Sequence, residues 1–188
     1  MDPVSLTSLW LPIVVSAVLV FLASFITHMV LTHHHSDFGK LPAEDEVMDA
    51  LRRFNLPQGD FMVPRPDSIK AMGSREFQEK LARGPVFIAT VFPNGQRGMG
   101  AQLAQWFGFC LVVSIFAGYM ASRALGPGAE YLRVSQMAST TAFLGYVMAK
   151  WSDVIWYRRS MSAAMKTTID GVIYGLLTGG VFGWLWPN

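Results

Sequence analysis

The sequence has little charge and only one cysteine. Charged residues make up 15% of its 188 residues, whereas a soluble globular domain carries about 25%. Apolar residues reach 52% and gather in long runs, which is typical of a membrane protein rather than of a large soluble core. Because Cys110 is the sole cysteine, a disulfide, a CxxC pair and a thiolate metal centre within one chain are excluded.

The sequence also lacks the motifs of common enzymes. It contains no P-loop, no GxSxG and no glycine pattern of a dinucleotide site. No nucleophile stands in a pattern with a base and an orienting group, so the sequence favours a protein without catalytic residues. The net charge of +2 is too small to indicate nucleic acid as a partner.

Four apolar runs are present, and a membrane-spanning helix needs about 20 such residues. The third run is the weakest, because it contains polar residues such as Gln136 and Thr140 and ends at Lys150. An interfacial or buried amphipathic helix is the alternative for that run. The sequence therefore predicts an all-α integral membrane protein with four transmembrane helices. The runs cover residues 9–31, 103–125, 134–151 and 167–186.

A polar insert lies between the first two runs. A helix is expected over residues 42–54, where acidic residues come first and arginines last, an order that suits the helix dipole. A second helix is expected over 74–83, with Ser74 as its cap. Residues 61–63 and 86–92 are β-branched and aromatic, which favours two paired strands. The expected divisions are a first helix at 1–32, a small α+β insert at 33–100 and three further helices at 101–188.

Basic residues are distributed unevenly over the expected loops. Nine fall in the insert, from Lys40 to Arg97, and four follow the third run. Only Arg123 and Arg133 fall on the other side. Because cytoplasmic loops are enriched in Lys and Arg, we expect a cytoplasmic insert and both termini outside.

Glycines recur at every fourth position in the last run. Residues four apart lie along one helix face, and small residues there let another helix approach closely. Two readings stay open: the face packs against a span of the same chain, or against another copy or a different membrane subunit. The glycines are Gly171, Gly175, Gly179 and Gly183, and the third run offers a matching row of small residues at Ala138, Ala142, Gly145 and Ala149.

All four histidines fall within eight residues, and a carboxylate follows them. The leading interpretation is a polar collar at the lipid headgroups, and no cofactor is firmly indicated. Imidazole and carboxylate together also suit zinc, iron or manganese, so a divalent metal is one alternative, although the spacing matches no established metal motif. A role in binding a proton or an anion is the other alternative. The candidate metal ligands are His33, His34, His35 and Asp37.

Further polar residues fall at the same ends of the runs. Charged groups in or near spans are costly and usually face the bundle interior or a water-filled cavity. We therefore expect a polar vestibule at the cytoplasmic face, with Lys166 and Asp170 paired because they are four apart on one helix. Its expected members are His28, Gln105, Lys150, Asp153, Lys166 and Asp170.

The stretch from His28 to Asp45, with its HHHSDF and LPAED segments, resembles a group of small bacterial inner-membrane proteins. The segment from Gly59 to Pro64 and the Gly84–Pro85 step are similar too. The resemblance implies one span, a short insert and three more spans in a bacterial inner membrane. It implies no activity and no functional residues.

Three functions are compatible with these patterns. The leading expectation is a non-catalytic accessory or structural subunit that packs through the glycine face onto another membrane subunit or onto itself. The alternative is a metal-binding membrane protein that uses the histidines and Asp37. A small transporter is the third, although the last run has no proline break of the kind seen in discontinuous transporter helices.

Overall fold

The computed structural model describes residues 4–95 and 98–188, so Arg97 of the insert lies outside the described residues. The described part is mostly helical, with one two-stranded sheet. It divides into two compact units. Residues up to Gly39 together with those from Gly98 onward form a helical bundle, and Lys40–Arg97 form the second unit.

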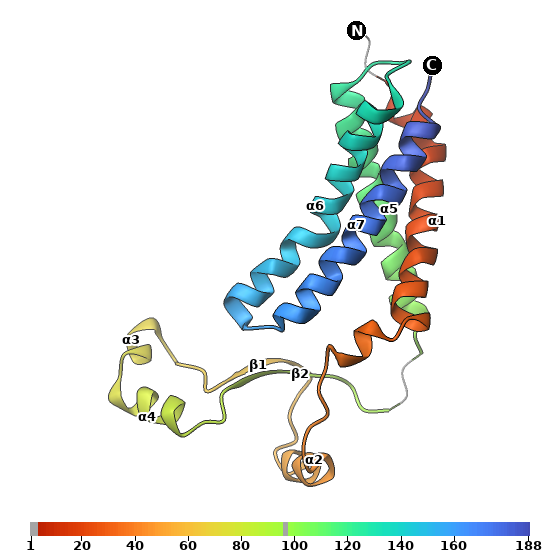
Figure 1. Ribbon diagram of the computed structural model, residues 1–188. Coiled ribbons are helices and arrows are strands. Elements are labelled where there is room, and N and C mark those ends of the chain that lie inside the picture. Colours follow the sequence, from red (N-terminus) through yellow and green to blue (C-terminus); the bar gives the residue numbers. More distant parts are fainter. Residues whose placement is uncertain (1–3, 96–97) are drawn as a thin grey trace. The chain divides into compact units, whose positions relative to one another are not determined.

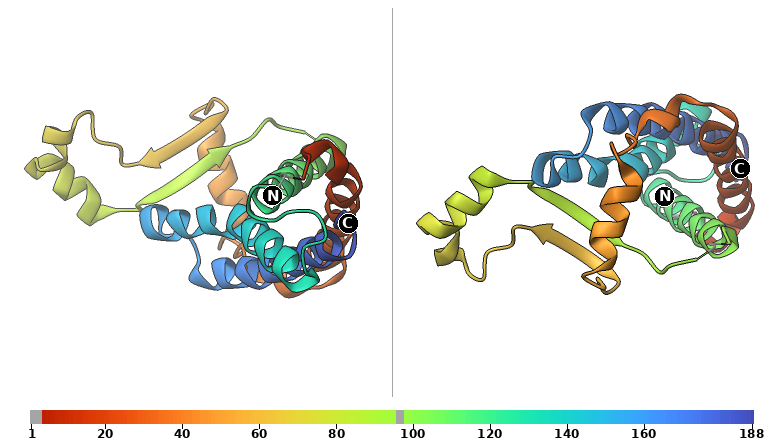
Figure 2. Two further views of the ribbon diagram at one scale, coloured as in Figure 1. Left: turned by 90° about the horizontal axis from the view of Figure 1, so that it is seen from above. Right: turned by 90° about the horizontal axis from the view of Figure 1, so that it is seen from below.

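The bundle contains four long helices that run alternately down and up (Figure 1). They are α1 (Trp10–Phe25), α5 (Gly100–Ala124), α6 (Tyr131–Tyr157) and α7 (Met161–Trp184). The 3₁₀ turn η1 (Leu6–Leu9) leads into α1, and the π-helical turn η2 (Ile26–Val30) extends it. Helices α1 and α6 each pack against both α5 and α7. Figure 2, which looks along the bundle, shows the four helices as a ring.

Two apolar clusters fill this bundle, one in each half. Near the termini, Leu9, Ala121, Val134 and Phe182 are buried together. Toward the other end, the second cluster includes Val20, Cys110, Val147 and Tyr174. The end with the termini is also closed by hydrogen bonds, since the Trp186 indole donates to the Gly126 carbonyl at 3.0 Å.

Among the described residues, two helical stretches are long and apolar enough to cross a membrane. They are Leu6–Val30, which contains α1, and Gly100–Ala124, which is α5. Helices α6 and α7 have 27 and 24 residues and are therefore long enough. Polar residues and glycines keep them below the same level of apolarity.

The glycine row of α7 lies against α6. A Cβ atom at Gly175 would stand 3.0 Å from the Ser139 carbonyl oxygen, and one at Gly179 would collide with Ser135 and Ser139. Gly171 faces Val147, and Gly183 faces Tyr131. The close approach of two helices, which the small residues predict, is thus made within the chain.

The second unit contains short elements. Its helices are α2 (Glu44–Arg52), α3 (Ile69–Met72) and α4 (Arg75–Arg83). Strands β1 (Gly59–Val63) and β2 (Phe87–Val91) pair antiparallel, with Phe61 opposite Ala89. The Ser74 hydroxyl accepts from the Phe77 amide at 3.2 Å and so caps α4. The small sheet and the cap agree with the sequence-based prediction.

Candidate metal centre

The candidate site lies at the end of the bundle opposite the termini, where three segments meet. Helix α1 gives way to the π-helical turn η2, which carries His28. After Leu31 the chain forms the 3₁₀ turn η3 (His33–Ser36), which carries His34. The first turns of α7 bring Asp170 to the same place. Single π-helical turns occur often at functional sites, because they shift the side chains on a helix.

His34 lies between two carboxylates. Its Nδ1 is 2.6 Å from Asp37 Oδ2, and its Nε2 is 2.7 Å from Asp170 Oδ2. Carboxylates only accept hydrogen bonds, so in this arrangement both ring nitrogens donate and the imidazole is protonated. The side chain of Asp170 is only 3% exposed, and the charged His34 offsets the cost of burying its carboxylate.

Lys166 completes a row of alternating charges. Its ammonium donates to Asp37 Oδ1 at 2.8 Å and to the Ser36 hydroxyl at 2.8 Å. The row therefore reads Lys166, Asp37, His34 and Asp170, with two positive and two negative groups. This corrects the expected pairing of Lys166 with Asp170. The polar turn η3 and Asp37 after it fold back, so that Asp37 and His34 lie between Lys166 and Asp170. Helical periodicity alone does not predict where this turn lies.

The electrostatics of His34 and Asp37 follow from this row. Burial acts to lower the pKa of His34, but the hydrogen bonds and charges of Asp37 and Asp170 outweigh it, so the pKa is raised. Burial acts to raise the pKa of Asp37, but Lys166 and His34 outweigh it, so the pKa is lowered. Both shifts favour the charged forms.

His28 and His33 flank this row. The His28 ring stacks on that of His34, with centroids 4.3 Å apart and planes 9° apart. His28 Nδ1 lies 2.9 Å from the Thr27 hydroxyl and 3.1 Å from the Ser24 carbonyl oxygen, so Nε2 is the ring nitrogen that is available to a metal. His33 Nε2 lies 3.6 Å from Asp170 Oδ1.

One ligand atom each from His28, His34 and Asp170 lie within 4.8 Å of one another. The structure thus brings together two of the four histidines with a carboxylate from α7. His35 is exposed, and Asp37 lies on the opposite ring nitrogen of His34. The set expected from the sequence shares only His34 with this group. Asp170 was placed in the vestibule but not among the ligands, because its approach to His34 depends on tertiary structure.

A pocket of about 470 Å³ opens beside this group; we call it the polar pocket because Asp37, Lys150 and Asp170 belong to its lining, most of which is apolar. Of the expected vestibule residues, His28, Lys150 and Asp170 line it, whereas Gln105 and Asp153 do not. Lys166 reaches the site through Asp37. Lys150 lies 4.0 Å from Asp153, and both side chains are largely exposed.

Aromatic side chains form another wall of this pocket. Tyr146 lies edge-on to Tyr174, with ring centroids 5.4 Å apart, and also contacts Trp106. Tyr146 is only 8% exposed. Its hydroxyl lies beside the Cys110 thiol, which is a weak hydrogen-bonding group, and has no oxygen or nitrogen partner among the described residues. An oxygen atom of a ligand in this pocket would be a stronger partner for the hydroxyl. The sequence carries no signal for this role of Tyr146.

Comparisons with protein-family models, with curated proteins and with solved structures give no match to this chain. The function is therefore inferred from the geometry of the site.

Proposed function

We propose that this chain is an integral membrane protein with four transmembrane helices that binds a divalent transition-metal ion at the polar end of the bundle. The observation that carries the proposal is the convergence of His28, His34 and Asp170 on one point. Two imidazoles and one carboxylate are the ligands of many zinc and non-haem iron sites.

The surroundings of these ligands support a metal site. A metal-binding histidine usually donates its other ring N–H to a carboxylate or carbonyl, which fixes the ring and its tautomer. Asp37 holds Nδ1 of His34 in this way, and the Ser24 carbonyl holds Nδ1 of His28. A metal ion would replace the proton shared by His34 Nε2 and Asp170, so the buried carboxylate keeps a positive partner.

Helix length and the distribution of exposed apolar residues support four spans. Helices of 24 to 27 residues exceed the roughly 20 residues that a bilayer requires. Leu22, Phe116, Leu144 and Leu176 are large apolar residues exposed on α1, α5, α6 and α7 respectively, as lipid-facing surfaces require. The excess of basic residues supports the placement of the metal site and the insert on the cytoplasmic side, and the resemblance of the stretch from His28 to Asp45 supports a bacterial inner membrane.

The accessory-subunit hypothesis is less well supported than the metal-binding one. It relied on the glycine row of α7 as a face for a partner, and α6 of the same chain covers that row. The metal-binding alternative is supported by the buried carboxylate of Asp170 and by the pocket beside it. The geometry therefore favours the metal-binding function over the subunit function.

Elemental analysis and zinc competition on the full chain in detergent test this proposal. We expect about one ion per chain in the wild type. In His28→Ala the Kd should rise at least about 100-fold, because losing a ligand costs more than the 10–100-fold effect of an outer-shell change. His28 is an exposed residue, so its removal leaves no buried charge unpaired.

His35→Ala is the matched control, because His35 is a neighbouring exposed histidine outside the ligand group. It should bind the ion like the wild type. Equal loss of metal in both variants, or no stoichiometric metal in the wild type after reconstitution with zinc, iron or manganese, would remove the metal-binding function.

A further inference from the structure

We propose that an apolar pocket between α1 and α5 holds the hydrocarbon tail of a single-chain membrane lipid, whose oxygen-bearing head group reaches the metal centre. The inference rests on the proposed function and adds a ligand class to it. It is carried by the position of this pocket, its lining and its connection to the polar pocket.

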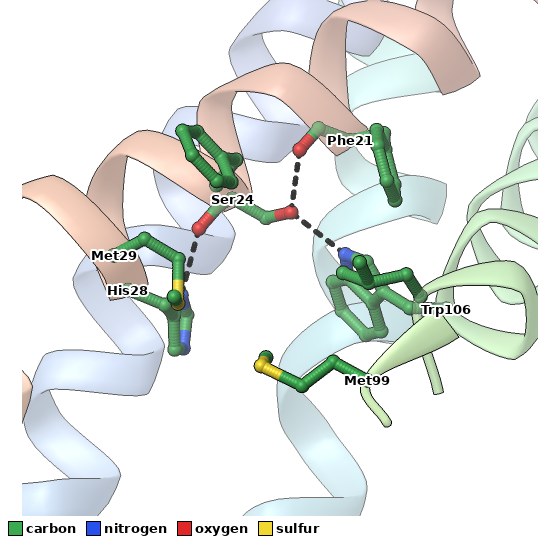
Figure 3. Close-up of a pocket in the computed structure, with 8 residues that line it drawn as sticks. Phe21, Ser24, His28, Met29, Met99 and Trp106 are labelled. Atoms are coloured by element: carbon green, nitrogen blue, oxygen red, sulfur yellow. Dashed lines mark hydrogen bonds between the residues drawn. The ribbon is translucent and has the colours of Figure 1, made fainter. Parts of the chain in front are cut away.

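The pocket has a volume of about 280 Å³ and an almost entirely apolar lining. Phe21, Phe25 and Met29 contribute from α1 and η2, and Met99, Leu103 and Trp106 from the start of α5 (Figure 3). This volume is just below the range of whole small-molecule sites, about 300–1,000 Å³. It suits part of one flexible chain better than a complete rigid ligand.

The few polar atoms of the lining have partners within the protein. The Ser24 hydroxyl accepts from the Trp106 indole at 2.7 Å and donates to the Phe21 carbonyl oxygen at 2.7 Å (Figure 3). Because these groups are paired, the lining offers little to a polar occupant apart from His28, which also lines the polar pocket. It offers carbon surface, from which an apolar chain gains dispersion contacts.

The location of the pocket identifies the source of such a chain. It lies between the two stretches that are apolar and long enough to cross a membrane. Large apolar side chains at its rim are half-exposed, with Phe25 at 50%, Met29 at 54% and Met99 at 53%. In the proposed orientation this rim faces lipid, so a chain can enter laterally from the bilayer without crossing water.

The apolar pocket adjoins the candidate metal centre, because His28 and Trp106 line both this pocket and the polar pocket. A tail in the apolar pocket with its head beside His28 would bring that head to the pocket that Tyr146 also lines. A head group with an oxygen atom could ligate the metal and accept the hydrogen bond from Tyr146.

Photo-labelling tests the assignment. The full-length protein in lipid nanodiscs is irradiated with a diazirine analogue of palmitic acid, and the labelled peptides are mapped by mass spectrometry. We expect saturable labelling of residues 21–29 and 99–106 that unlabelled fatty acid displaces. Leu103→Trp fills the pocket and should lower this labelling about fivefold or more, the equivalent of about 1 kcal/mol.

Val112→Trp is the control, because it adds the same bulk at an exposed position on the same helix and should leave labelling unchanged. Met29→Trp fills the pocket from the opposite helix in case Leu103→Trp does not fold. Labelling that unlabelled fatty acid does not displace, or that falls equally in the Val112→Trp control, would overturn the lipid assignment.

The metal content of each variant separates the two proposals. Leu103→Trp should keep its metal, which also shows that it has folded. If the wild-type protein binds metal but shows no saturable labelling, only the lipid pocket is contradicted. Saturable labelling in a protein that binds no metal would support the tail pocket and contradict only the metal function.

Discussion

His34 occupies the centre of the site because its two ring nitrogens meet carboxylates from different parts of the chain. Asp37 is three residues away, whereas Asp170 comes from another helix. The first contact is local and holds the ring, while the second ties η3 to α7. Each contact is a charge-assisted hydrogen bond, which is about twice as strong as a neutral one.

At the residue scale, Asp37→Asn should weaken metal binding without abolishing it. Asp37 orients His34 and raises its basicity without touching the metal, and such outer-shell changes typically cost 10–100-fold in affinity. Competition with a zinc chelator measures the effect. Because His28→Ala removes a ligand, it should cost more than Asp37→Asn, and the reverse order would contradict the assigned roles.

In the metal-free protein, the charged row should stabilise the fold only within a limited pH range. His34 has a pKa above its ordinary 6.5, so its contribution to folding stability is complete below pH 6.5 and is lost as pH rises through the raised pKa. Asp37 has a pKa below its ordinary 3.8, so its contribution is complete above 3.8 and is lost as pH falls through the lowered value.

Histidine resonances of the metal-free protein report this window directly. Asp170→Asn removes one of the two carboxylates and should bring the pKa of His34 down from the wild-type value. A His34 titration that is identical in the wild type and in Asp170→Asn would contradict the ion pair.

At the element scale, the contact between α6 and α7 depends on residues without a Cβ atom. Gly179→Ala should destabilise the protein by about 1–3 kcal/mol, as overpacking of a close contact does, because the methyl group would collide with Ser135 and Ser139. Thermal unfolding in detergent measures this loss.

Gly180→Ala is the matched control for that loss. The nearest atom to its Cβ is the Tyr131 hydroxyl at 3.7 Å, and alanine favours a helix by about 1 kcal/mol over glycine. It should therefore be neutral or stabilising. Equal destabilisation by both alanines would show that the helix contact is not made as described.

The sequence predicts a close helix neighbour for the glycine row, but it leaves open whether that neighbour belongs to the same chain. The third apolar run is the internal candidate, and the structure places α6 there. The expected row on α6 contains Gly145, which instead faces Val113 of α5. The residues that meet the glycines include Ser135, Ser139 and Val147. The rotation of α6 about its axis depends on contacts with α5, which periodicity alone does not contain.

The same limit applies to the metal centre. A dense group of histidines beside Asp37 predicts metal ligands in one segment, because proximity in sequence is all that a single sequence displays. The third proposed ligand, Asp170, lies 136 residues from His34 along the chain. Only the packing of α7 beside the turn after α1 brings it there. By contrast, the cap of α4 and the two strands are local features, and the sequence predicts both.

At the scale of the whole molecule, the two ends of the bundle differ. The end where both termini lie (Figure 1) is closed by apolar residues and by the Trp186 hydrogen bond, whereas the other end carries the charged row and the proposed metal ligands. This difference agrees with the excess of basic residues on one side. It gives the orientation proposal a direct test.

Cysteine labelling in intact bacterial cells tests the orientation. In a Cys110→Ser background, Asn188→Cys should react with a membrane-impermeant maleimide from outside. Arg159→Cys, in the exposed connection between α6 and α7, should react only after the membrane is permeabilised. Reaction of both from outside would contradict four spans, and reversed accessibility would invert the orientation.

The contact between α6 and α7 has a consequence for how the protein enters the membrane. Neither helix reaches the apolarity of α1 or α5, and only three residues connect them, Arg158 to Ser160. During biogenesis, α6 alone would expose serine and threonine side chains to hydrocarbon. We expect the translocon to release α6 late and together with α7, as a preassembled hairpin. A truncation after Ser160 should then leave α6 outside the bilayer, although its own sequence is unchanged.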